Sequence, residues 1–199
     1  MSNIIQKHTL VDGSRNLEVH VHIDGDGSGD ESYTTLIDAS SYSPAFTEVK
    51  LMGVQSNLIG FSAELTYEGT PVASGTTDGT TANKLVDSGA SFDTDGTAVG
   101  MWVYNSTDDT DAVITAIDGA TTLSISADIM ATGEDYEIGG KVHCWSLPDY
   151  EQRQSFDKTG GIPNNRLTTP IGDISLSTTG LGAGDTGHVV ISLKKKTLA

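Results

Sequence analysis

The chain has 199 residues, of which 27 are Asp or Glu and 11 are Lys or Arg, so its formal net charge is -16 at pH 7. Phosphate binding needs clustered Lys and Arg, and this balance argues against nucleic acid as a partner. No stretch approaches the roughly 20 apolar residues of a membrane span and the first residues do not resemble a signal peptide, so we expect no membrane partner and synthesis in the cytoplasm without a secretory signal.

The first segment of the chain predicts a β-hairpin. Residues 8–12 and 15–23 flank Asp12-Gly13, a dipeptide typical of tight hairpin turns. The second of these segments alternates apolar and polar residues, which places His20 and His22 on the polar face of a strand. An acidic, glycine-rich turn follows at residues 24–31.

The rest of the chain outside residues 69–140 reads as short strands separated by turns. Residues 46–55 and 58–67 are expected to form a hairpin across Ser56-Asn57, and residues 149–167 a long loop. No amphipathic helix of ten or more residues is predicted, because the 3.6-residue period is absent. The pattern favours an all-β fold, an antiparallel β-sandwich of jelly-roll-like topology. Strands are predicted at residues 33–37, 46–55, 58–67, 141–147, 172–178 and 187–194.

Residues 69–140 differ in composition from the segments on either side. They contain twelve acidic residues and one basic residue, Lys84, and therefore carry -11 of the net charge of -16. Loop tips whose ends lie close together tolerate insertions. The sequence therefore predicts two domains: a discontinuous outer β-sandwich of residues 1–68 and 141–199, and an acidic β-domain of residues 69–140 inserted at the tip of a hairpin. Strands of the inserted domain are predicted at residues 82–88, 99–104, 111–117, 121–126 and 136–138, with a turn at Asp118-Gly119.

One cluster has the residue types of a metal site. His20 and His22 share a strand face, and imidazoles at this spacing ligate transition metals. The loop after them resembles the start of a calcium loop, with Asp24, Asp26 and Asp30 as oxygen donors, but its twelfth position is Thr35 where a bidentate Glu is needed. Two interpretations stay open: a β-type calcium site, or an acidic turn above an exposed His pair. We assign no metal ligand.

No residue pattern points to catalysis. The carboxylates lie mostly in turns, and neither a Gly-x-Ser-x-Gly nucleophile turn nor a phosphate-binding loop occurs. Cys144 is the only cysteine; it excludes an intrachain disulfide and is expected to be a small buried apolar residue. We therefore predict that the protein is not an enzyme, with no catalytic residue and no cofactor.

Two further features have a structural and a binding interpretation. Sugar stacking is an alternative to core packing for the few aromatic residues near the second domain boundary and within the insertion. Lys194-Lys195-Lys196 is expected to be a solvated tail, with contact to an acidic neighbouring subunit as the alternative. The aromatic residues concerned are Trp102, Tyr104, Trp145 and Tyr150.

Several segments resemble small virion structural proteins of tailed bacteriophages. In the outer domain these are Val11 to Leu17, Val19 to Asp30, Ile37 to Pro44, Trp145 to Asp149 and Thr179 to Gly187. In the inserted domain, Thr80 to Ser88, Gly100 to Asn105 and Thr121 to Ser124 look like a β-module found in various phage particle proteins. The resemblance implies a β-sandwich with a grafted β-domain, and it implies no catalytic residues.

The resemblance implies a virion component and does not give its place in the particle; our first hypothesis is a capsid cement or decoration protein on the outer surface of the virion. Its partners would be the major capsid protein or other virion proteins, met through the N-terminal arm Met1 to Lys7 and exposed strand edges. A homo-oligomer is expected, with a trimer as one form. The alternatives are a connector at the neck, tail or baseplate, and a receptor- or glycan-binding module in which the inserted domain recognises the receptor or glycan.

Overall fold

The computed structural model describes residues 2–196 and is all-β, with antiparallel sheets and two short 3₁₀ turns. The chain divides into two compact units. We name residues 1–68, 143–166 and 170–199 the outer unit, because they come first and last in the sequence, and residues 69–142 and 167–169 the inserted unit.

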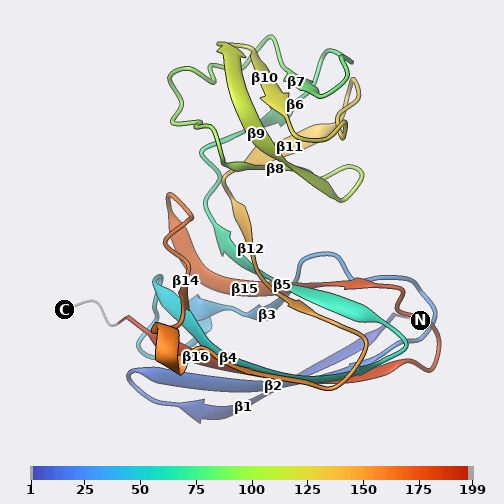
Figure 1. Cartoon of the computed structure of the whole chain (residues 1–199), viewed down its shortest axis with the longest axis vertical. Coiled ribbons are helices and arrows are strands. Elements are labelled where there is room, and N and C mark those ends of the chain that lie inside the picture. The colour runs from blue at the N-terminus through green and yellow to red at the C-terminus, as the bar shows by residue number, and fades with distance from the viewer. Residues whose placement is uncertain (1, 197–199) are drawn as a thin grey trace. The chain divides into compact units, whose positions relative to one another are not determined.

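The outer unit is a sandwich of two antiparallel sheets (Figure 1). One sheet has the order β1-β2-β16-β4-β13, with β14 also pairing with β4, and the other has the order β12-β5-β15-β3. Their strands are β1 (Ile4–Asp12), β2 (Asn16–Asp24), β3 (Thr34–Ile37), β4 (Val49–Ile59), β5 (Ser62–Gly69), β12 (Lys141–Leu147), β13 (Gln152–Ser155), β14 (Ile162–Pro163), β15 (Pro170–Thr179) and β16 (Thr186–Lys195). The 3₁₀ turns are η1 (Ala39–Ser41) and η2 (Asp157–Thr159).

The strand order is that of a jelly roll. Setting aside β1 and the two-residue β14, the strands β2, β3, β4, β5, β12, β13, β15 and β16 can be numbered first to eighth along the chain. The first sheet then has the order first, eighth, third, sixth, and the second sheet has the order second, seventh, fourth, fifth. Two such sheets built from eight strands define the jelly roll. The jelly-roll expectation is therefore confirmed, and β1 is an additional strand at the edge of the first sheet.

The alternation of β2 explains how the core forms. Leu17, Val19, Val21 and Ile23 are buried, whereas the residues between them face outwards, so the apolar set lies on one side of the sheet. β16 and β4 repeat the pattern across the sheet. The apolar faces of the two sheets close on each other, and this burial is the main stabilising contribution to the unit. Phe61, Leu65, Tyr67 and Ile174 contribute from the second sheet and its turn.

The inserted unit is one six-stranded antiparallel sheet of order β6-β11-β8-β9-β10-β7. The backbone N–H of Asp78, just after β6, donates to the carbonyl of Val86 in β7 at 3.0 Å, so the two end strands meet and the sheet curls around its own core. Leu85, Phe92 and Leu123 are fully buried in that core. The strands are β6 (Ala73–Thr76), β7 (Lys84–Val86), β8 (Trp102–Asn105), β9 (Thr110–Gly119), β10 (Thr122–Ile125) and β11 (Asp135–Ile138).

The hairpin expected across Ser56-Asn57 is wrong. β4 runs through both residues to Ile59 and belongs to the first sheet, whereas β5 belongs to the second. In β4 buried and exposed residues alternate, and Ser56 occupies one of the buried positions. This serine therefore lies within the strand and does not mark a turn. The chain turns instead at Gly60, whose φ of 96° favours glycine and where a side chain would collide with the carboxylate of Asp185.

The long loop expected at residues 149–167 is also wrong. It contains β13, which pairs with β4 as the last strand of the first sheet, and β14, which pairs with the start of β4. β13 has the sequence Gln-Arg-Gln-Ser, so its polar composition concealed an edge strand that has little apolar burial of its own.

The solvated tail expected at the lysine cluster is wrong for Lys195. This residue lies in β16, its side chain is buried, and its ammonium pairs with the carboxylate of Asp12 at 2.5 Å. The ammonium also lies 5.3 Å from the ring centroids of Tyr42 and Phe46. Lys196 pairs with Glu48 at the surface.

The hairpin expected across Asp12-Gly13 is confirmed, because β1 pairs with β2 from Ile4 opposite Asp24 to Asp12 opposite Leu17. The N-terminal arm is corrected: residues 4–7 belong to β1 and are paired along one side, and residue 1 lies outside the described residues.

Candidate functional site

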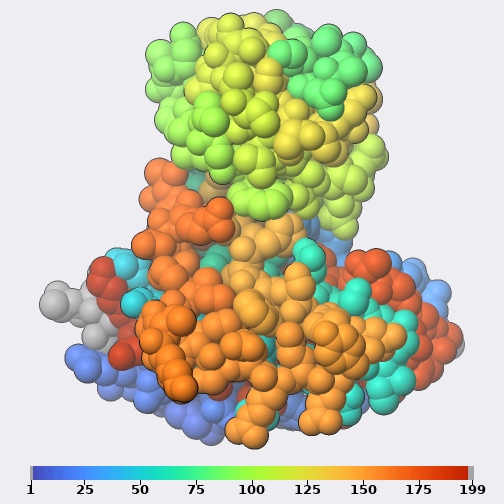
Figure 2. Space-filling model, in the orientation of Figure 1, coloured from blue at the N-terminus to red at the C-terminus, as the bar shows by residue number. Residues whose placement is uncertain are grey.

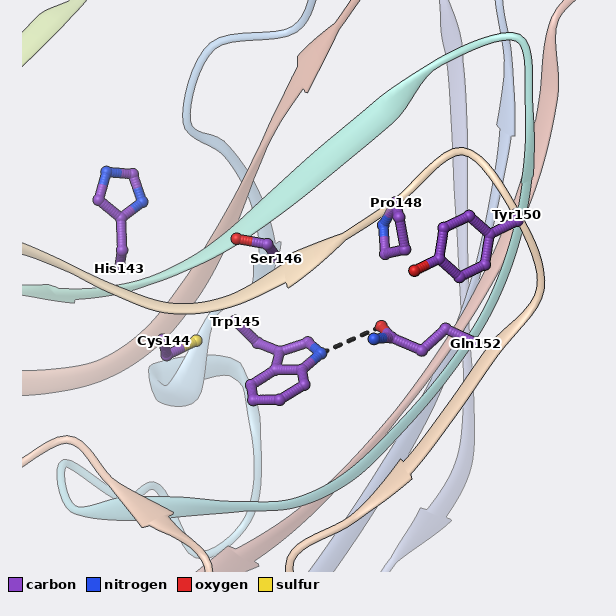
Figure 3. A pocket seen from close by; sticks show the side chains of 7 residues that line it. All are labelled: His143, Cys144, Trp145, Ser146, Pro148, Tyr150 and Gln152. Carbon is purple, nitrogen blue, oxygen red and sulfur yellow. Dashed lines mark hydrogen bonds between the residues drawn. The ribbon is translucent and has the colours of Figure 1, made fainter.

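A shallow pocket of about 550 Å³ lies at the side of the sandwich, where each sheet ends. It is formed by β12, which is an edge strand of the second sheet, by β13, which is an edge strand of the first sheet, and by the turn between these two strands (Figure 3). In Figure 2 the tan and orange atoms from β12 to β14 form the face of the outer unit turned to the viewer. The lining residues are His143, Cys144, Trp145, Ser146, Pro148, Tyr150 and Gln152.

Trp145 is fixed from two directions. Its indole N–H donates to the side-chain oxygen of Gln152 at 3.1 Å, a bond that joins β12 to β13 (Figure 3). Its ring meets Phe156 edge to face, with the ring centroids 4.7 Å apart. Such aromatic pairs and a satisfied indole N–H hold the ring in one orientation. Trp145 is nevertheless only half-buried, so part of its surface borders the pocket.

Tyr150 stands on a turn that is held in place by its neighbours. The turn closes through a bond of 2.8 Å from the backbone N–H of Tyr150 to the carbonyl of Pro148. It is tied to the turn after β4, because Asp149 accepts from the N–H of Gly60 at 2.8 Å. The side chain of Tyr150 is 61% exposed, an unusual position for a large aromatic residue.

Polar groups gather at the His143 end of the pocket. The Nδ1 atom of His143 lies 3.0 Å from a carboxylate oxygen of Glu64 and 3.3 Å from the hydroxyl of Thr66, both on β5. The hydroxyl of Ser146 donates to the other carboxylate oxygen of Glu64 at 3.4 Å. Glu64 thus positions polar side chains of β12 beside the aromatic part of the pocket.

Cys144 is not set up as a nucleophile. Its thiol donates to the carbonyl of Leu65 at 3.2 Å, and burial raises the pKa of the thiol to about 12. The reactive form of cysteine is the thiolate, which is scarce at neutral pH when the pKa is this high. The residue is half-buried and borders the pocket, so the full burial expected from the sequence is not observed.

A second cluster brings four imidazoles together on the outward face of the first sheet. His20 Nε2 lies 3.1 Å from His188 Nδ1, and the rings of His22 and His188 are stacked with centroids 4.5 Å apart. His8 lies opposite His20 in the strand register. Burial and the neighbouring imidazoles, first that of His188, lower the pKa of His20. The sequence shows only the pair on β2, because His8 and His188 arrive through strand pairing.

The acidic loop after β2 does not converge on a common point. Asp24 pairs with His22 at 3.0 Å, Asp26 accepts from the N–H of Ser28, and Asp30 accepts from Thr178 and from the N–H of Leu181. Each candidate oxygen thus satisfies a local donor. Among residues 2–196 no group of three or more His, Cys, Asp or Glu side chains is arranged to hold a metal ion.

The aromatic candidates of the inserted unit lie on β8. Trp102 and Tyr104 are half-buried, and the ammonium of Lys141 lies 4.5 Å from the centroid of the Tyr104 ring. The sequence named all four aromatic candidates, and the structure brings Trp145 and Tyr150 together in one pocket. The sequence analysis did not identify Gln152, which lies in the segment predicted to be a loop. It also did not identify Glu64, which is distant in the sequence from its partners on β12.

Comparison with known proteins identifies no relative: no protein-family model matches the chain, and no curated protein matches it. In the described part of the chain, no helix has the length and apolar character needed to cross a membrane.

Proposed function

We propose that the protein is a non-enzymatic structural component of a tailed-bacteriophage virion, a cement or decoration protein that binds the head shell through its outer unit. The inserted unit adds a large negative charge, which favours hydration and opposes clumping of particles. The resemblance described above supplies the virion context, and jelly rolls recur in viral capsid proteins, although a fold alone does not fix a function.

The observation that carries the proposal is β1. It lies outside the eight strands of the jelly roll and pairs with β2 on one side, while it ends the sheet on the other. Ile4, Leu10 and Val11 on this strand are 50%, 54% and 45% exposed. β1 is an edge strand that pairs in regular register from Ile4 to Thr9 and is irregular at Leu10, and its regular part is a template for pairing with a strand of another chain.

Decoration of a shell needs only modest affinity per copy. Many copies bound to a symmetric lattice act together, so a weak contact at each β1 adds up to a stable coat. A symmetric oligomer such as a trimer would raise the effective affinity further. The major capsid protein is the partner that this arrangement implies.

The test is addition of the purified protein to mature particles, with heads and tails, that lack it, followed by cryo-electron microscopy. We expect ordered density at lattice positions on the outer surface. Leu10→Lys should weaken binding at least tenfold without unfolding the protein, because the residue is exposed and the change removes an apolar contact at the edge. Ile59→Lys, an equally exposed position on β4, is the matched control and should bind normally.

Two results would contradict the proposal. Density confined to the neck, tail or baseplate would identify a connector instead. Absence of binding to heads by a protein that remains folded would reject the shell as its partner.

A further inference from the structure

We infer that the pocket between β12 and β13 binds a neutral saccharide unit, with Trp145 and Tyr150 as its aromatic surfaces. The inference concerns the free protein and does not depend on the virion role. Of the four aromatic residues for which the sequence offered sugar stacking as an alternative, it selects the two in the outer unit, Trp145 and Tyr150.

The aromatic residues of the pocket suit the apolar face of a sugar ring. A sugar ring has an apolar face made of C–H groups, and the flat, amphipathic faces of Trp and Tyr suit such a surface. Trp145 is fixed by Gln152 and Phe156, and Tyr150 is presented on a turn closed by its own backbone and tied down by Asp149. The Trp145 ring is therefore pre-ordered and loses little conformational entropy on binding, whereas for Tyr150 only the backbone position is fixed.

The polar residues in and next to the pocket can bind the hydroxyl groups of a sugar. Gln152, Ser146 and His143 line the same pocket, and Glu64 lies next to it through its contacts with His143 and Ser146. Amides, hydroxyls and carboxylates supply the donors and acceptors that sugar hydroxyls need. The few polar groups next to an apolar surface are typical of small-molecule sites, and a volume of about 550 Å³ falls in their usual range.

The negative charge near the pocket favours neutral sugars over acidic ones. Glu64 is adjacent, and the whole chain carries a net charge of -16, so a uronic acid or a sialic acid would be repelled. Neutral hexoses and N-acetylhexosamines meet no such penalty. The expected affinity of a single shallow site is weak, with Kd on the order of 1 mM.

The experiment uses the full chain with the substitution Trp102→Phe. The chain has two tryptophans, so Trp145 becomes the sole tryptophan, and excitation selective for tryptophan reports on it alone. We would titrate this protein with glucose, galactose, mannose, N-acetylglucosamine and N-acetylgalactosamine, with glucuronate as the acidic comparison. Amide chemical shifts in nuclear magnetic resonance spectra provide a readout that does not depend on tryptophan.

We expect at least one neutral sugar to change the fluorescence and to shift amides of residues 143–152. Tyr150→Ala should weaken binding about tenfold, the scale of one lost aromatic contact, and Gln152→Ala should also weaken it because Trp145 loses its partner. Both residues lie on or near an exposed turn, so the variants should fold. Tyr104→Ala in the inserted unit is the matched control and should bind as the parent does.

Three outcomes would overturn the inference. One is the absence of any shift in residues 143–152 at sugar concentrations far above the expected Kd. Another is binding that Tyr104→Ala abolishes and Tyr150→Ala leaves intact. The third comes from titrating the same protein with a proline-rich peptide, whose rings also stack on aromatic residues: binding of this peptide without binding of any sugar. Shell binding is measured on separate particles, so failure here leaves the virion proposal untouched.

Discussion

The ion pair between Lys195 and Asp12 should respond very differently to loss of the anion and loss of the cation. The Lys195 side chain has no exposed surface, whereas that of Asp12 is 36% exposed. Asp12→Ala leaves a buried ammonium without its anion. Lys195→Met instead leaves a carboxylate that water can solvate, and places an apolar chain of similar length against Tyr42 and Phe46.

The magnitudes follow from this asymmetry. Removing one partner of a buried ion pair costs about 3–5 kcal/mol, while replacing the charge by an apolar group of similar volume is often close to neutral. Because water reaches the Asp12 carboxylate, we expect Asp12→Ala to lower the free energy of unfolding by about 2–3 kcal/mol. We expect Lys195→Met to change it by less than about 1 kcal/mol, and the double variant to resemble Lys195→Met.

The assay is urea denaturation of the outer unit, followed by Trp145 fluorescence in the Trp102→Phe background. This reporter matters because a chain with two units need not unfold in a single step. A double-mutant cycle then gives the coupling energy between the two side chains. Equal losses in the two single variants, or no loss in Asp12→Ala, would refute the reasoning.

Three other predictions use the same denaturation measurements. Tyr67→Phe removes a buried hydroxyl that accepts from the backbone of β4 and donates to that of β14, so the free energy of unfolding should fall by about 2–4 kcal/mol. Burial, with the adjacent imidazoles, lowers the pKa of His20; the native state then binds fewer protons than the unfolded chain, and stability should fall as the pH drops below about 6.5. His20→Gln should flatten that fall. Burial raises the pKa of Cys144 to about 12, so at neutral pH a thiol reagent should label this half-buried residue far more slowly in the native state than after urea unfolds the protein; equal labelling rates would contradict this.

The alternation of apolar and polar residues predicted most strands of the outer unit, because alternate residues of a strand face the core and are buried there. β2 and β16 alternate apolar and polar residues, and an alternating segment next to a turn dipeptide has one reasonable interpretation. β13 escaped detection because an edge strand packs little apolar surface, and its polar sequence resembles that of a loop. Ser56 misled for the converse reason: it is a turn-forming residue buried within a strand.

The candidate site was predictable only in its aromatic part. Trp145 and Tyr150 are visible in the sequence as neighbouring aromatic residues, but Glu64 lies 82 positions from its partner Ser146. His188 is likewise 168 positions from His20. Contacts of this kind depend on which strands become neighbours, and a single sequence carries no signal for that choice. The ion pair of Lys195 was unpredictable for the same reason, because its partner Asp12 lies near the opposite end of the chain.

The topology explains why the insertion is placed where it is. Along the eight strands of the jelly roll, successive strands alternate between the two sheets except from the fourth to the fifth, which are β5 and β12 and lie side by side in the second sheet. At this connection the chain leaves and returns on adjacent strands, and the N–H of Gly69 donates to the carbonyl of Gly140 at 2.8 Å. An insertion whose ends already meet adds little loop-closure entropy and need not separate the sheets. The hairpin is thus a position where an all-β module can be added while the jelly roll keeps its strand order.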